Sequence, residues 1–120
     1  MNRWTLLKHE KLNDEMLEFH YDFLLENGKD CKTWKLLILP ELDGPSVEIF
    51  KHSNHRLIWL KVESQLLTNK RGYVQRVDYG TFKPLGADIN NNNFSIILRG
   101  NSINGLFKKK AHLCQLISLI

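Results

Sequence analysis

Residues 19–39 read FHYDFLLENGKDCKTWKLLIL, and this stretch decides the fold. Two apolar segments of strand-like composition, residues 19–26 and 32–39, lie on either side of Asn27-Gly28. An Asn-Gly pair readily adopts the positive φ angles that a tight hairpin turn requires. The stretch therefore predicts two antiparallel strands that are joined by a turn at Asn27-Gly28.

Turn-forming residues separate short apolar segments along the rest of the chain, and no long helical pattern interrupts them. Further strands are predicted at residues 3–8, 47–51, 56–62, 73–79, 81–85, 94–99 and 106–110. This inventory indicates an all-β fold, without the helical crossovers of a parallel sheet. We expect a small antiparallel β-barrel of about eight strands, a single domain over residues 1–120, because closure removes exposed strand edges.

Two segments do not follow the strand pattern. Residues 11–18 place apolar side chains at near-helical spacing among acidic neighbours, so a helical turn and a long loop both fit. The apolar tail, residues 111–120, is expected to form a strand or a short helix. In either form it has to cover an apolar surface of the core or of a partner.

The composition is that of an ordinary folded domain. The chain has 120 residues, 42% of them hydrophobic and 25% charged, which excludes a multidomain enzyme, a disordered chain and a coiled coil. We expect no secretion signal, and no apolar run reaches the roughly 20 residues of a membrane span. We therefore expect a cytoplasmic protein without a membrane partner, with Cys31 and Cys114 as thiols instead of a disulfide.

Basic charge is concentrated in the second half of the chain. Residues 1–60 carry 8 basic and 10 acidic side chains, whereas residues 61–120 carry 9 and 3. A cationic face is typical of a nucleic-acid-binding surface, and it is equally compatible with a surface that only keeps the protein soluble.

The arrangement around His20 is the most informative for chemistry. On a strand, residues i and i+2 point to the same face, so the imidazole of His20 and the carboxylate of Asp22 project side by side. Nitrogen and oxygen donors together suit Mn²⁺ or Zn²⁺, and His9, near the end of the first predicted strand, is the candidate for a third ligand. The alternative is a structural His-Asp pair. His52 and His112 show no such arrangement, and we expect them to be ordinary surface or core histidines.

The order of these motifs resembles the 3′-phosphoesterase domain of bacterial DNA ligase D and its small stand-alone relatives. The resemblance runs through residues 4–9, HYDFLLENG at 20–28, KTW at 32–34, NHRLIWL at 54–60, GYV at 72–74, DYGTF at 78–82 and the closing hairpin at 94–105. These motifs occur in the same order as in the family and cover nearly the whole chain.

The resemblance implies an all-β barrel that trims damaged or ribonucleotide-containing 3′ ends of DNA in a metal-dependent reaction and leaves a 3′-hydroxyl. It implies His9, His20 and Asp22 as ligands of a divalent metal, expected to be Mn²⁺, with Zn²⁺ or another first-row ion as alternatives. His55 would contact or protonate the phosphate, and so act with His20 and Asp22 in catalysis. DNA 3′ ends, with or without RNA, are the implied partner, together with a ligase or polymerase of DNA repair.

The sequence departs from the family at two site positions. Leu24 stands where the family has an arginine after His-Tyr-Asp-Phe, and Trp59 stands where it has a tyrosine. We expect Arg71 or Arg76 to replace the missing guanidinium, so that the phosphate-binding set is His55, Trp59, Arg71 and Arg76. The alternative function is that of a catalytically degenerate relative that binds nucleic-acid ends or a repair partner without turnover.

Overall fold

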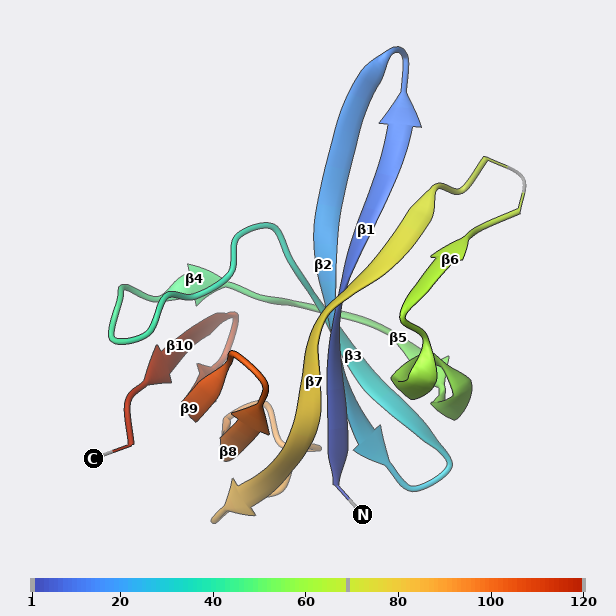
Figure 1. The fold of residues 1–120 in the computed structure, drawn as a ribbon. Helices are drawn as coiled ribbons and strands as arrows, with labels where there is room; N and C mark the ends of the chain where they lie inside the picture. The colour runs from blue at the N-terminus through green and yellow to red at the C-terminus, as the bar shows by residue number, and fades with distance from the viewer. Residues whose placement is uncertain (1, 69, 120) are drawn as a thin grey trace.

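The computed structural model describes residues 2–68 and 70–119, and one antiparallel sheet of ten strands accounts for most of them (Figure 1). The strands are β1 (Arg3–Asn13), β2 (Met16–Asn27), β3 (Asp30–Leu36), β4 (Val47–Glu48), β5 (Phe50–Arg56), β6 (Ser64–Leu66), β7 (Tyr73–Leu85), β8 (Phe94–Gly100), β9 (Asn104–Lys110) and β10 (Leu113–Ile117). A short 3₁₀ helix, η1 (Leu57–Lys61), follows β5. The all-β, antiparallel expectation is confirmed.

The sheet is not closed into a barrel, so this part of the expected fold is wrong. Its strand order is β4-β10-β9-β8-β7-β1-β2-β3-β5, and β6 pairs with β7 outside this path. The two end strands, β4 and β5, are consecutive in the chain and are separated by the buried Ile49 alone. At this point the chain changes its partner from β10 to β3, and this change leaves the ladder open.

Two hairpins surround β2. The turn predicted at Asn27-Gly28 is confirmed, since Asn27 pairs with Asp30 and Gly28 has a φ of +71°. Residues 11–18, for which a helical turn or a long loop was expected, instead extend β1 and β2 to a two-residue turn. Asp14 and Glu15 form this turn with φ angles of +48° and +66°, as a type I′ turn requires. The hairpin tip projects beyond the rest of the molecule (Figure 1).

Three other segments differ from the sequence-based expectation or complete it. Residues 56–62 are not a strand, because β5 ends at Arg56 and η1 turns Leu60 into the interior. The strands expected at 73–79 and 81–85 are one strand, β7, and Gly80 lies within it because a Cβ there would overlap the carbonyl oxygen of Arg99 on β8. The apolar tail forms β10, whose Leu116 is buried in the core.

Two apolar clusters lie on opposite faces of β1 and β2. The larger includes Trp4 and Trp34, which are only 1% and 2% exposed. The smaller consists of Leu7, Leu24, Cys31, Leu60 and Val74, beneath η1. Cys31 and Cys114 are free and buried, and burial raises their pKa values to about 11 and about 12. Among the described residues, the structure contains no helix long and apolar enough to cross a membrane.

Candidate metal centre and phosphate cleft

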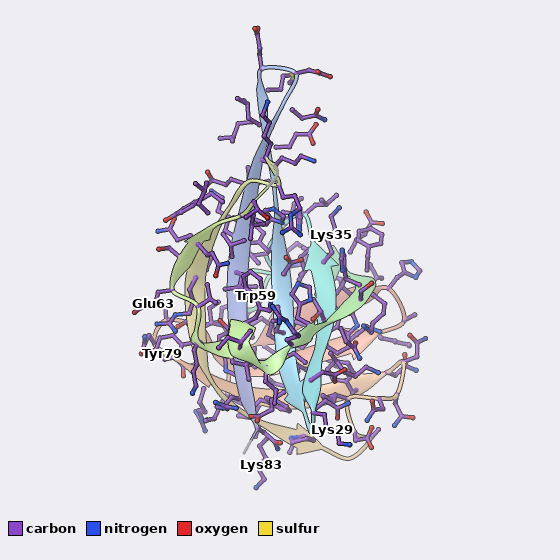
Figure 2. All side chains as sticks on the ribbon, turned by 90° about the vertical axis from the view of Figure 1, so that its right-hand side faces the viewer. Lys29, Lys35, Trp59, Glu63, Tyr79 and Lys83 are labelled. Atoms are coloured by element: carbon purple, nitrogen blue, oxygen red, sulfur yellow. The ribbon has the colours of Figure 1, made fainter. Side chains whose placement is uncertain are left out.

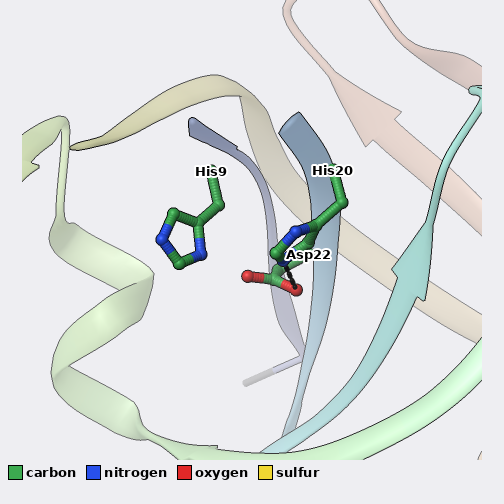
Figure 3. Close-up of side chains that lie close together, drawn as sticks. All are labelled: His9, His20 and Asp22. Atoms are coloured by element: carbon green, nitrogen blue, oxygen red, sulfur yellow. Dashed lines mark ion pairs between the residues drawn. The ribbon is translucent and has the colours of Figure 1, made fainter. Parts of the chain in front are cut away.

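Strand pairing brings together the three residues that the sequence suggested as metal ligands. His9 of β1 lies directly opposite His20 of β2 in the antiparallel register, and the two ring centroids are 4.9 Å apart. Asp22, two residues beyond His20, projects from the same face of β2. One ligand atom from each residue lies within 4.8 Å of the others, and Figure 3 shows the two imidazoles converging on the carboxylate.

Asp22 is held as a carboxylate beside the imidazole of His20. Its side chain is buried, and His20 Nε2 lies 3.2 Å from Asp22 Oδ1 (Figure 3). Burial alone would raise the pKa of Asp22, but His20, and less strongly His55 and His52, lower it to a net value below the ordinary one. The carboxyl group therefore carries a full negative charge at neutral pH.

The donor set fits a divalent metal ion. Asp22 Oδ1 is buried without a hydrogen-bond partner among the described residues, because its approach to His20 lacks the alignment of a hydrogen bond. An unpartnered buried carboxylate oxygen is costly, and a cation would satisfy it. His9 Nε2 donates a hydrogen bond to the carbonyl oxygen of Arg71 at 2.7 Å, which leaves His9 Nδ1 as the lone-pair nitrogen. Two imidazole nitrogens and one carboxylate oxygen are accepted by Mn²⁺, Zn²⁺ and other first-row ions.

The three residues open into a cleft of about 620 Å³ between the β1–β2 hairpin, β5 and the segment before β7. Its apolar floor includes Leu7 and Val74 of the smaller core cluster. The ionisable side chains that line it are His9, Lys11, His20, Asp22, His52, His55, Arg56 and Arg71. A surface with one carboxylate and several cationic or imidazole groups is suited to an anionic ligand such as a phosphate.

A bulge in β5 places two histidines in this cleft. Cys31 pairs with His55 and Thr33 pairs with His52. The two paired positions are therefore three residues apart on β5 but only two apart on β3, so β5 contains one extra residue. The extra residue brings both imidazoles into the cleft, with ring centroids 6.0 Å apart. His55 was expected at the site, but His52 was not, because a spacing of three residues puts regular strand positions on opposite faces.

Arg71 lies in the cleft and Arg76 does not appear among its lining residues. The Arg71 side chain donates to the carbonyl oxygen and the hydroxyl of Thr68, both at 3.1 Å. Arg76 is engaged elsewhere, with its guanidinium 3.7 Å from the ring centroid of Tyr79 and 3.4 Å from Glu63 Oε1. Of the two arginines considered as replacements for the missing guanidinium, only Arg71 lines the cleft.

The two positions at which the sequence departs from the ligase D family differ in their surroundings. Leu24 is fully buried in the smaller core cluster. Trp59 lines the cleft from η1, with its ring centroid 6.1 Å from that of His55 and nearly perpendicular to it. In Figure 2 Trp59 lies over β1 and β2, the strands that η1 contacts. Trp59 therefore presents an aromatic ring at the cleft, whereas Leu24 is part of the core.

Comparison with the models of known protein families finds no match, and neither does comparison with curated protein sequences.

Proposed function

We propose that this chain is a metal-dependent phosphoesterase that acts on the 3′ ends of nucleic-acid strands. The observation that carries the proposal is the convergence of His9, His20 and Asp22 within 4.8 Å at a cleft that also contains His55 and Arg71. Mn²⁺ is the proposed ion, and Zn²⁺ fits the same donors. The expected reaction removes a 3′-phosphate or a 3′-ribonucleotide and leaves a 3′-hydroxyl, as the resemblance to the ligase D domain implies.

A bound divalent ion would supply positive charge against the phosphate oxygens. Residues of the chain would bind the phosphate, orient the nucleotide and supply a proton. The Arg71 guanidinium would pair with a phosphate oxygen, and Trp59 would offer its ring to the terminal base or sugar. His55 would donate a proton to the 3′-oxygen as its bond to phosphorus breaks. Water would form the new bond to phosphorus and release one proton to solvent, so that protons balance over the reaction.

The excess of basic residues in the second half of the chain supports a nucleic-acid substrate. Arg71 at the cleft belongs to this half, whose 9 basic and 3 acidic side chains give a net charge of +6. Attraction of a polyanion by such a surface accelerates association and makes binding sensitive to salt. A DNA end, alone or within a repair assembly that includes a ligase or polymerase, is the partner that we propose.

Release of inorganic phosphate from a 3′-phosphorylated DNA primer–template tests the proposal. We expect release by the wild-type chain with Mn²⁺, and only background release by His20→Ala and Asp22→Ala or without metal. His112→Ala is the matched control, because His112 is not among the residues of the cleft, and it should behave as wild type. A second substrate with a 3′-terminal ribonucleotide distinguishes DNA from RNA-containing ends. No metal-dependent release above the level of His20→Ala would overturn the proposal.

The second candidate function is a binding module without turnover, and the burial of Leu24 favours it. With Leu24 in the smaller core cluster, no guanidinium can reach the phosphate from this position of β2. Such a module would bind 3′-phosphorylated ends without added metal, and its affinity would fall steeply with salt concentration. Binding that is equal in wild type and His20→Ala, together with absent phosphate release, would favour this function over the enzyme.

A further inference from the structure

The peptide groups of one residue, Ser53, contact both histidines of the β5 bulge. The Ser53 N–H donates a hydrogen bond to His52 Nδ1 at 2.9 Å, and the Ser53 carbonyl oxygen lies 3.1 Å from His55 Nδ1. An amide N–H can only donate and a carbonyl oxygen can only accept. His52 Nδ1 must therefore be the lone-pair nitrogen of its ring, whereas His55 Nδ1 must carry a proton. The backbone thus assigns opposite tautomers to two neighbouring imidazoles.

These tautomers give the two rings different chemistry in the same cleft. In His52 the ring proton resides on Nε2, and a second proton on Nδ1 would oppose the Ser53 N–H. Nε2 is therefore the hydrogen-bond donor of this ring. In His55 the Nδ1–H stays bound to the carbonyl oxygen, whether or not Nε2 is protonated. His55 can therefore take up and release a proton at Nε2 without losing its orientation.

The amino group of Lys51, in β5, contacts both β3 and the bulge. Its Nζ donates to the carbonyl oxygen of Thr33 at 3.0 Å and to Asn54 Oδ1 at 3.1 Å, and it also contacts the carbonyl oxygen of His52. These contacts hold the residues before and after Ser53 to one amino group. The charged side chains that line the cleft together with this pair are those of Lys11, Asp22, Arg56 and Arg71. Lys51 therefore links the bulge to the backbone of β3.

We propose that His52 is a further phosphate-binding residue, which donates from Nε2 to the phosphate of a 3′-phosphorylated nucleotide end, while His55 Nε2 is the atom that transfers the proton. The inference rests on the proposed function, because it assigns separate parts to two residues of that cleft. It explains why a second histidine lies beside His55: one imidazole that changes its protonation state works next to one that keeps its donor hydrogen.

Nitrogen-15 NMR of the histidine rings in the full metal-free chain tests the tautomers directly. In the neutral form of each ring, we expect His52 with its proton on Nε2 and His55 with its proton on Nδ1. Spectra of His52→Gln and His55→Gln assign the signals. His52 with its proton on Nδ1, or His55 with its proton on Nε2, would overturn the division of roles.

Binding of adenosine 3′-monophosphate, followed by calorimetry with and without Mn²⁺, tests the phosphate contact. We expect His52→Ala to weaken binding about tenfold, which is the worth of one hydrogen bond. His52→Gln, which keeps an N–H donor, should remain within about threefold of wild type, and His112→Ala should not change binding. Equal affinity of wild type and His52→Ala, or no binding by wild type, would overturn the inference. Nucleotide binding with the expected loss in His52→Ala but without phosphate release would overturn the proposed hydrolysis alone.

Discussion

Asp78 provides the sharpest test of how the sheet is held together. Asp78 is 3% exposed, and its carboxylate accepts four backbone N–H bonds. Oδ1 accepts from Tyr79 at 2.8 Å and Asn101 at 3.0 Å, and Oδ2 accepts from Ser102 at 3.0 Å and Ile103 at 2.7 Å. One side chain of β7 therefore satisfies the donors of the turn between β8 and β9.

The change Asp78→Asn keeps the shape of this side chain but not its acceptors. In either orientation of the amide, one oxygen becomes an NH₂ group that faces two N–H donors. Two charge-assisted hydrogen bonds are lost, at about 1.5–3 kcal/mol each, so we expect the free energy of unfolding at pH 7 to fall by about 3–6 kcal/mol. The total free energy of unfolding of a small domain is about 5–15 kcal/mol, so the variant is expected to be only marginally folded.

The same bonds make the effect depend on pH. Burial acts to raise the pKa of Asp78, but the backbone N–H groups of Ile103, Ser102, Tyr79 and Asn101 lower it below its ordinary value. A carboxyl with a lower pKa in the folded state stabilises the fold above its unfolded pKa of about 3.9 and loses this contribution as the pH falls through the folded value. The difference between wild type and Asp78→Asn should therefore shrink in acid.

Urea denaturation followed by tryptophan fluorescence, at pH 7 and in steps down to pH 3, measures both effects. Asp88→Asn is the control, because Asp88 is exposed and its carboxylate accepts one bond, from the Asn90 N–H at 2.7 Å. It should cost less than about 1 kcal/mol. A loss below about 1 kcal/mol for Asp78→Asn at pH 7, or a loss that does not change with pH, would refute the reasoning.

Two further changes test the local packing around the cleft by the same denaturation assay. In Gly72→Ala, at a φ of +102°, the new Cβ would overlap the carbonyl oxygen of Glu10, so we expect a loss of at least about 3 kcal/mol. Gly28→Ala, with a φ of +71° but open space, should cost about 1–2 kcal/mol, and equal losses would contradict the steric argument. Leu24→Ala should cost about 2–5 kcal/mol because Leu24 is fully buried. Leu66→Ala, at a leucine that is 77% exposed, should change stability by less than about 0.5 kcal/mol, and a similar cost for both leucines would show that Leu24 is not part of a packed cluster.

Local sequence patterns were sufficient to predict most strands and the site residues that lie close together in the sequence. The Asn27-Gly28 turn follows from two residues, and alternation along β2 is enough to put His20 and Asp22 on one face. The type I′ turn at Asp14 and Glu15 was missed, because it lacks the glycine that usually marks such a turn and its flanking apolar residues are exposed.

The sequence by itself determined the all-β class, the hairpin at Asn27-Gly28 and the His20–Asp22 pair, because each depends on backbone geometry within a few residues. Only the tertiary structure decided that His9 pairs with His20, that His52 joins His55, and that the ladder stays open between β4 and β5. Strand register, bulges and edge pairing are set by hydrogen bonds between segments far apart in the chain. The pattern of side chains within one strand does not by itself fix which residue of another strand lies opposite, because bulges and turns shift the register.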